Sequence, residues 1–223
     1  MSEPSPFDLT VASYDATADV YATWVGTEIS AAIEAPLDRA LLAAFAEMIT
    51  AAAGPVADIG CGTGRAAAFL HRHGLRVIGV EPSPGMLAVA RTAHPHLDLR
   101  EGALSDLPLR DGEMAGAVCW YSIIHTAPDQ LAAGFAEVAR TVAHGGELLL
   151  AFQAGRGEVV HRTSVQDRAV SLTNFRHDPD AVADSLTRSG FHVHTRAIRD
   201  ATGDHESTPQ AFLIAERVRP SRS

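Results

Sequence analysis

The sequence predicts an α/β fold: a Rossmann-like, doubly wound, seven-stranded sheet, mostly parallel with an antiparallel edge strand, with helices on both faces. Short apolar runs alternate with amphipathic helical stretches, and glycine-rich or acidic turns follow those runs. Near the C-terminus, runs 191–198 and 210–216 have no helix between them, which is typical of an antiparallel hairpin. The 223 residues suit one domain, 1–223.

Each remaining element has its own local signal. Apolar runs followed by turns predict strands, and apolar residues at helical spacing predict helices. The expected elements are a helix at 36–53, a strand at 56–60, a helix through 73, strands at 75–81 and 97–100, a strand at 115–122, a helix at 128–143, a strand at 147–152 and a helix at 179–189. Residues 1–54 form an N-terminal helical cap, in which residues 1–9 are expected to be a loose tail.

Composition excludes several classes of protein. A hydrophobic content of 46% and a charged content of 20% are ordinary for a globular chain, and no apolar run approaches the ~20 residues of a membrane span. The net charge of −9 disfavours a nucleic-acid partner, since phosphate binding needs a basic face. The N-terminal residues lack the pattern of a signal peptide, so we expect a cytoplasmic protein with no membrane contact. A monomer and a homodimer both stay open.

Several kinds of catalytic chemistry are also excluded. All 18 basic residues are arginine, which rules out a Schiff-base lysine and the phosphate-binding loop that requires lysine. Cys61 and Cys119 have neither the number nor the spacing of a zinc or disulfide framework. His192 and His194 share a strand face without a third ligand, so we expect no metal site.

A glycine-rich turn follows the first strand, with glycines at alternate positions 60, 62 and 64 and a helix immediately afterwards. Such a turn brings backbone close to a nucleoside-type ligand. Arg65 stands where a dinucleotide fingerprint has its third small residue, and so does not fit that fingerprint. Asp58 precedes the loop, where a carboxylate would repel a diphosphate and attract a ligand with an amino group and a sulfonium.

The stretch D-I-G-C-G-T-G-R at residues 58–65 resembles the first motif of the class I S-adenosylmethionine-dependent methyltransferases, and the resemblance covers about residues 10 to 217. It implies S-adenosyl-L-methionine as the cofactor, with S-adenosyl-L-homocysteine as the product, and a small-molecule acceptor. The residues then expected to contact the cofactor are Tyr14, Asp58, Gly60, Cys61, Gly62, Gly64, Arg65, Glu81, Pro82, Met86, Ala103, Leu104, Trp120 and Tyr121.

The second and third strands supply the nucleoside contacts in this interpretation. Glu81 ends the second strand about 20 residues after the loop, where a carboxylate accepts hydrogen bonds from a ribose diol. By the resemblance, Met86 faces the adenine, although a methionine at such a position is often plain core. The loop that begins at Glu101 departs from the family pattern, because Ala103 replaces an acidic residue and leaves the backbone of Ala103 and Leu104 to bond the adenine.

The end of the fourth strand should line the reaction site, because ligands bind at the carboxyl ends of strands in such sheets. Trp120 and Tyr121 are expected to form a wall beside the sulfonium. His125 is the candidate general base or substrate-orienting group. The alternative is a histidine held by backbone near a helix start that contacts only the cofactor.

The cap and residues 154–178 are expected to close the site. Residues 13–22 resemble the family's lid segment, so Tyr14 is expected to bond the methionine end and Tyr21 to close the pocket, unless both are helix–core contacts. Residues 154–178 should form a flap of two short strands over the acceptor pocket. Its candidate substrate contacts, unless they are merely solvated, are Glu158, His161, Arg162 and Arg176, together with Tyr21 and His125 outside it.

These expectations define one function and two alternatives. The first is methyl transfer from S-adenosyl-L-methionine to an oxygen or nitrogen atom of a small molecule by in-line displacement, for which the protein chiefly positions donor and acceptor. The alternatives are a nicotinamide-dependent Rossmann oxidoreductase, and a protein that binds S-adenosyl-L-methionine without transferring its methyl group.

Overall fold

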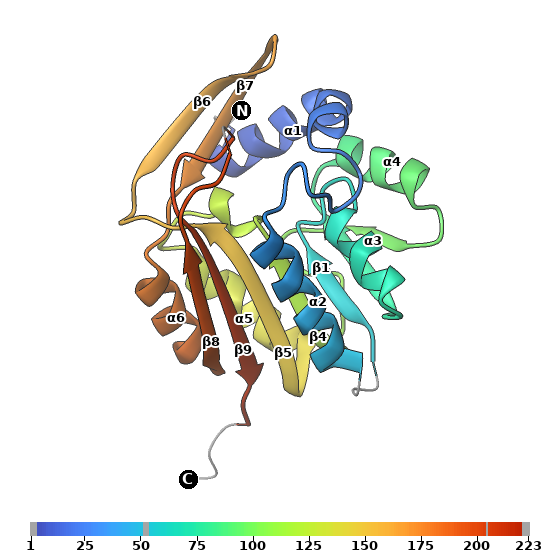
Figure 1. Cartoon of the computed structure of the whole chain (residues 1–223), viewed down its shortest axis with the longest axis vertical. Coiled ribbons are helices and arrows are strands. Elements are labelled where there is room, and N and C mark those ends of the chain that lie inside the picture. Colours follow the sequence, from blue (N-terminus) through green and yellow to red (C-terminus); the bar gives the residue numbers. More distant parts are fainter. Residues whose placement is uncertain (1–3, 51–53, 204, 220–223) are drawn as a thin grey trace.

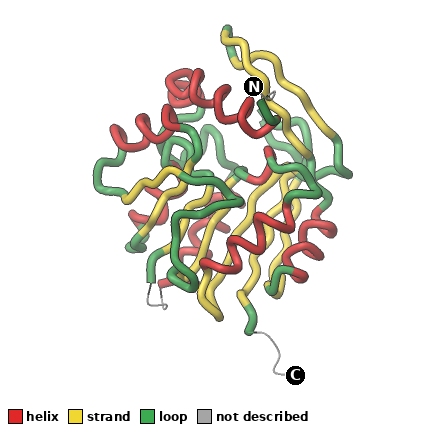
Figure 2. The backbone as a smooth tube through the Cα atoms, turned by 180° about the vertical axis from the view of Figure 1, so that it is seen from behind, coloured by secondary structure: helices red, strands yellow, loops and turns green. Residues whose placement is uncertain are grey.

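The structure is a computed structural model that describes residues 4–50, 54–203 and 205–219, and a central sheet with helices on both faces dominates it (Figures 1 and 2). The elements in chain order are α1 (Pro6–Trp24), α2 (Pro36–Thr50), β1 (Val56–Ile59), α3 (Arg65–Arg72), β2 (Val77–Glu81), α4 (Pro84–Ala93), β3 (Asp98–Glu101), β4 (Met114–Trp120), η1 (Ile123–His125), α5 (Leu131–Thr141), β5 (Val142–Gln153), β6 (Val159–Val165), β7 (Arg168–Phe175), α6 (Pro179–Arg188), β8 (Phe191–Arg199) and β9 (Gln210–Arg217).

The strand order of the large sheet is β3-β2-β1-β4-β5-β9-β8. The first five of these strands run parallel, and β9 pairs antiparallel with both β5 and the edge strand β8. The predicted doubly wound sheet with an antiparallel edge is therefore confirmed. The carboxyl ends of β1, β2 and β4 lie side by side, so the segments that follow these strands meet at one edge.

Two layers of helices bury the sheet. Helices α2 and α3 pack on one face through Phe45, Ile49 and Leu70, and α5 and α6 pack on the other through Phe135 and Leu186. Every residue of β1, β2 and β4 is buried, as the near-continuous apolar runs of a parallel sheet require.

The expected apolar stripe of α2 is only partly core. Leu42, Phe45 and Ile49 are buried, whereas Leu37 and Met48 are 41% and 38% exposed. The helix covers the sheet with a narrower face than the sequence pattern indicated. The predicted end of this helix at 53 lies outside the described residues.

The expectation of a loose tail is wrong for residues 6–9, because α1 begins at Pro6, and residues 1–3 lie outside the described residues. The Asp8 amide donates to the Ser5 hydroxyl oxygen (3.2 Å), and the Ser5 amide donates to the Asp8 carboxylate (2.9 Å), which forms a capping box. Pro6 occupies the first helical position, where its missing N–H costs nothing.

Two smaller boundaries also differ from the sequence predictions. Helix α5 ends at Thr141, and β5 extends from Val142 through the glycine pair to Gln153. The fourth strand ends at Trp120, because Tyr121 has a φ of 60° and leaves the extended conformation.

Strands β6 and β7 form a separate two-stranded sheet that projects above the main sheet beside α1 (Figure 1). The Ser171 amide donates to the Ser13 hydroxyl oxygen (2.9 Å), and the Arg168 guanidinium donates to the Ala16 carbonyl (2.9 Å). Helix α1 and this hairpin therefore form a continuous cover. Within the described ranges, no helix combines the length and apolar character needed to cross a membrane.

Candidate functional site

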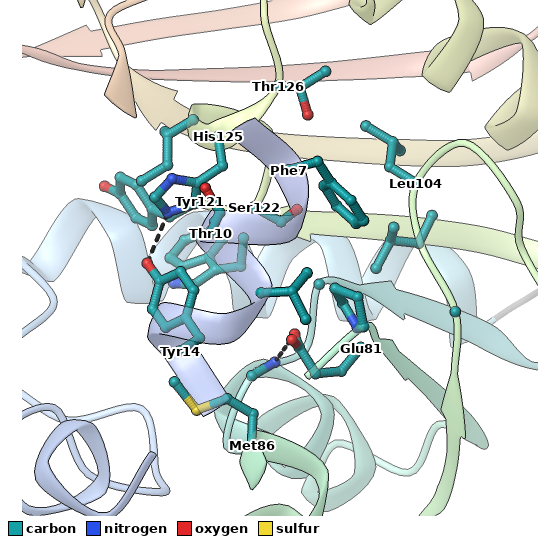
Figure 3. A pocket seen from close by; sticks show the side chains of 18 of the residues that line it. Phe7, Thr10, Tyr14, Glu81, Met86, Leu104, Tyr121, Ser122, His125 and Thr126 are labelled. Atoms are coloured by element: carbon teal, nitrogen blue, oxygen red, sulfur yellow. Dashed lines mark hydrogen bonds between the residues drawn. The ribbon is translucent and has the colours of Figure 1, made fainter. Parts of the chain in front are cut away.

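A cavity lies at the carboxyl ends of β1, β2 and β4, beneath α1 (Figure 3). The space within it is about 940 Å³, with its opening to solvent included. Many of the residues singled out from the sequence line it, namely Tyr14, Tyr21, Gly60, Gly62, Glu81, Pro82, Met86, Leu104, Trp120, Tyr121 and His125.

The glycine loop and Glu81 form one hydrogen-bonded unit. The Gly62 amide donates to Oε2 of Glu81 (2.9 Å; Figure 3). The Ser83 amide donates to Oε1 (2.9 Å). Each carboxylate oxygen keeps a further lone pair for a ligand. Burial raises the pKa of Glu81, and the two amides oppose that shift.

Glycine is required in this loop for two different reasons. A Cβ on Gly60 would lie 2.3 Å from the Cβ of Ser122, so the ends of β1 and β4 touch through backbone. A Cβ on Gly62 would meet no atom within 4 Å. Both residues have positive φ, 72° and 54°, which L side chains rarely adopt. The space beside Gly62, which lines the cavity, is therefore open.

Trp120 and Tyr121 form the wall at the end of β4, with their rings edge to face at 5.6 Å. The Trp120 indole nitrogen and the Tyr121 hydroxyl are buried and have no hydrogen-bond partner among the described residues. Together with the positive φ of Tyr121, they mark a locally strained segment of the kind that clusters at functional sites.

Tyr14 and His125 both line the cavity and are hydrogen-bonded to each other, 2.7 Å from hydroxyl oxygen to Nε2 (Figure 3). Nδ1 of His125 lies 2.9 Å from the Thr173 carbonyl, which can only accept, so Nδ1 carries the proton. Nε2 is then the acceptor, and the Tyr14 hydroxyl donates to it. Burial lowers the pKa of His125 to about 4, so the imidazole is neutral near pH 7. Burial also raises the pKa of Tyr14.

The geometry of His125 is compatible with both of its expected roles, a general base or substrate-orienting group and a backbone-held cofactor contact. A backbone carbonyl holds the ring, and the ring also lines the cavity. Whether it acts as a base or only contacts a cofactor stays a prediction.

Asp58 and Arg65 lie beside the cavity without lining it. The Asp58 carboxylate accepts a hydrogen bond from the Ala67 amide (2.8 Å) at the start of α3, and burial raises its pKa to about 7. The Arg65 guanidinium is directed to the connection between α1 and α2, where it pairs with Glu34 and donates to the Glu28 carbonyl (3.2 Å). The structure thus gives Asp58 a helix-capping contact, and direct ligand binding by either side chain stays a prediction.

Cys61, Gly64 and Ala103 do not line the cavity either. The Cys61 thiol is buried against Leu99, and burial raises its pKa. Gly64 packs closely on a histidine, since a Cβ there would lie 3.0 Å from the His94 ring. The backbone N–H and C=O of Ala103 bond those of Asp106, which closes a turn. Of the two residues expected to bond the adenine with backbone, Leu104 therefore lies on the cavity and Ala103 lines a shallow adjoining groove.

The flap candidates lie away from the cavity. Glu158 accepts from the Arg156 amide (2.7 Å), His161 bonds the Thr173 hydroxyl (3.0 Å), and Arg176 donates to Ser207 (3.1 Å). Arg162 is exposed, although its charge is close enough to lower the pKa of His125 further. Contacts of these side chains with a substrate stay predictions.

The sequence interpretation missed the first two turns of α1, which contribute Phe7, Thr10 and Val11 to the cavity. The Ser5–Asp8 capping box was the available signal, because it predicts a helix start before these residues. Ile124 and Thr126, on either side of His125, were also missed. In residues 4–50, 54–203 and 205–219, no group of three or more His, Cys, Asp or Glu side chains could hold a metal ion.

Comparison with known proteins finds similarity to methyltransferases in the part of the chain that contains the glycine loop and Glu81. A family model described as a methyltransferase domain matches residues 56–146, from β1 into β5. An uncharacterized methyltransferase of Mycobacterium tuberculosis is 29% identical in an alignment 185 residues long, which covers 70% of this chain and 73% of that protein. The malonyl-[acyl-carrier protein] O-methyltransferase of Serratia marcescens is 36% identical over 95 residues, 41% of this chain and 35% of that protein.

Solved structures share the fold at low sequence identity. The [4+2]-cyclase SpnF superposes with a TM-score of 0.71 at 16% identity, over 98% of both chains. An S-adenosylmethionine-dependent methyltransferase of Methanosarcina mazei has a TM-score of 0.66 at 16% identity, over 74% of this chain and 92% of that one. The family model and these relatives therefore show that the chain is similar to methyltransferases, and the sheet order and the solved structures show that it shares the fold of S-adenosylmethionine-dependent methyltransferases.

Proposed function

We propose that the protein binds S-adenosyl-L-methionine in this cavity and transfers the methyl group to an oxygen or nitrogen atom of a small-molecule acceptor. The observation that carries the proposal is the Glu81 carboxylate bonded to the glycine loop, with the Tyr14–His125 pair also lining the same cavity. The Glu81 carboxylate with the glycine loop suits a nucleoside, and the Tyr14–His125 pair can receive a proton.

The cavity residues fit this cofactor. Glu81 has unused lone pairs for the two hydroxyls of a ribose, and the space beside Gly62 admits a bound group. The cofactor supplies an electrophilic methyl group on a cationic sulfur, and a negative site favours such a cation.

Charge disfavours the nicotinamide alternative. Among the described residues that line the cavity, Glu81 is the one acidic side chain and none is a lysine or an arginine, and the His125 imidazole is neutral near pH 7. Arg65, the first cation after the loop in the sequence, lies beside the cavity without lining it, and its guanidinium is paired with Glu34. The Gly62 amide, which a diphosphate would need, already donates to Glu81. A dinucleotide would therefore meet a carboxylate and no cation.

The acceptor is assigned to the side of the cavity near Tyr14 and His125. Because Nε2 of His125 already accepts from the Tyr14 hydroxyl, Tyr14 can take a proton from an acceptor as it gives its own to His125. The lining contributed by Phe7, Val11 and Ile124 is apolar and suits a small molecule with an apolar face.

Two measurements test the proposal. Calorimetry with S-adenosyl-L-homocysteine and with NAD should show binding of the first alone. Transfer of a labelled methyl group should then be followed across a panel of hydroxyl and amine acceptors, with His125→Ala lowering turnover and sparing cofactor affinity. Binding of NAD without S-adenosyl-L-homocysteine would contradict the proposal.

A second candidate is a protein that binds S-adenosyl-L-methionine without using its methyl group. It is favoured by the similarity to a protein named as a [4+2]-cyclase, which extends over 98% of the chain. Tight binding of the cofactor with no S-adenosyl-L-homocysteine formed with any acceptor would support this candidate over the first.

A further inference from the structure

Asp15 connects the lid helix to the opposite side of the cavity from His125. Its Oδ1 accepts hydrogen bonds from the Gly85 amide and, at 3.3 Å, from the Ser83 hydroxyl, at the N-terminus of α4. The preceding residue, Tyr14, bonds His125, and Ser13 bonds the flap. Three consecutive residues of α1 thus attach it to three separate elements around the cavity.

Gly85 allows this approach. It is the second residue of α4, and a Cβ there would lie 2.8 Å from both the carbonyl oxygen and Oδ1 of Asp15. A side chain at this position would have to displace the backbone of α1. Glycine is otherwise unfavourable inside a helix, so close contact with the lid accounts for it.

The contact is favourable and reversible. A carboxylate at a helix N-terminus satisfies an otherwise unpaired amide and interacts well with the helix dipole. The Ser83 hydroxyl already accepts from the Met86 amide (3.2 Å), so Asp15 supplies a second cap from another element. Because Asp15 is exposed, the Gly85 amide can bond water when the lid moves away.

The other end of α1 is attached separately. After α1, the side chains of Thr63, His94 and Arg65 bond three successive carbonyls, those of residues 26, 27 and 28, at 2.8, 2.8 and 3.2 Å. Gly26 has a φ of 86° at this point. Loss of the Asp15 contact would therefore release the cavity side of the helix and leave its far end in place.

We propose that Asp15 is a positioning residue, whose contact with Gly85 holds α1 closed over the cavity and sets Tyr14 against His125. The consequence for ligand retention rests on the proposed function, since it assumes that S-adenosyl-L-homocysteine occupies the cavity. The effect of Asp15 on the contact between Tyr14 and His125 does not depend on a bound ligand.

The first experiment measures dissociation of S-adenosyl-L-homocysteine by stopped flow in Asp15→Ala and in Gly85→Ala. Loss of one charge-assisted hydrogen bond predicts dissociation about tenfold faster in each. Asp15→Asn keeps an acceptor oxygen and should recover part of the loss. The double variant should be no faster than the single ones, because both release the same contact. Asp184→Ala, the same change on the exposed side of α6, is the matched control.

The second experiment follows the His125 ring by NMR as a function of pH, without ligand. Its pKa is about 4 in the closed protein, where it faces the Tyr14 hydroxyl, the Thr173 carbonyl and the Arg162 charge. In Asp15→Ala and Gly85→Ala, exposure should raise this pKa toward 6.5. Circular dichroism would confirm that α4 is retained, and alanine favours a helix at position 85.

The outcomes separate the two proposals. Failure of the unaltered protein to bind S-adenosyl-L-homocysteine would reject the proposed function, and the His125 titration would still test the lid. Normal binding, with unchanged dissociation and unchanged His125 titration in both variants, would overturn the role of Asp15.

Discussion

The cavity has a floor and a roof that are built in different ways. The floor comprises the glycine loop, Glu81 and the end of β4, and its contacts follow strands that are buried along their whole length. The roof comprises α1, with the β6–β7 hairpin packed beside it, and side chains distant in sequence hold it, such as Tyr14 on His125 and Ser13 on Ser171. Substitutions in the floor are therefore expected to cause large losses of stability or affinity, and substitutions in the roof to cause small ones.

The largest expected effect concerns Asp58, in the buried strand β1 that leads into the floor. Its pKa is raised by burial to about 7 from an ordinary value of 3.8. Between these values the folded state binds more protons than the unfolded chain, so stability falls as pH rises through this window. The free energy of unfolding that Asp58 contributes should fall by on the order of 4 kcal/mol across this window. Urea denaturation of Asp58→Asn at several pH values should show a flatter profile, and an equally steep decline would assign it to another group.

Gly60→Ala tests the close approach within the floor. A positive φ and a Cβ 2.3 Å from that of Ser122 should together lower the free energy of unfolding by about 3 kcal/mol. Gly112 is the matched control, because it has a φ of 61° and a Cβ there would meet no atom within 4 Å. Gly112→Ala should lose only about 1 kcal/mol. Equal losses would mean that conformational strain alone accounts for glycine at position 60.

Glu81→Gln tests the nucleoside half of the floor. An amide has one acceptor oxygen where the carboxylate has two, so S-adenosyl-L-homocysteine should bind about thirtyfold more weakly, or by about 2 kcal/mol. Calorimetry measures the change, with Glu47→Gln on the exposed side of α2 as the control. Unchanged affinity would remove Glu81 from the site.

Tyr14→Phe tests a contact of the roof, the hydrogen bond between Tyr14 and His125. It removes the hydrogen bond to Nε2 of His125 and keeps the ring, so the free energy of unfolding should fall by about 1 kcal/mol. Thermal and urea unfolding measure this. Stability equal to that of the unaltered protein would show that the pair does not persist in solution.

The smallest effect is expected where the roof is most exposed. Arg168 and Asp19 join the hairpin to α1, but their side chains are 47% and 66% exposed. Asp19→Ala should change the free energy of unfolding by less than about 0.5 kcal/mol. A loss as large as that of Tyr14→Phe would contradict the contrast between these two roof contacts.

Much of the floor could be predicted because its signals are local. An apolar run, alternating glycines and a helix start specify a strand, a turn with positive φ and a helix within ten residues. Glu81 could be predicted in the same way, because it is the acidic residue at the end of the next strand, β2. The roof was harder to predict, since the partners of residues 13–15 lie at 83–85, 125 and 171. The start of α1 was the exception, because its capping box was present in the sequence.

The sequence by itself determined the order of the elements, the positions that must be glycine, and the acidic residue at the end of β2, because backbone sterics and burial act over short stretches. Only the tertiary structure decided where long side chains point. It directed Asp58 into α3 and Arg65 onto Glu34, and it gave the proton of His125 to Nδ1 by placing that nitrogen against a carbonyl. The physical reason is that a side chain bonds whatever partner packing brings within about 3 Å, and that partner can lie anywhere in the chain.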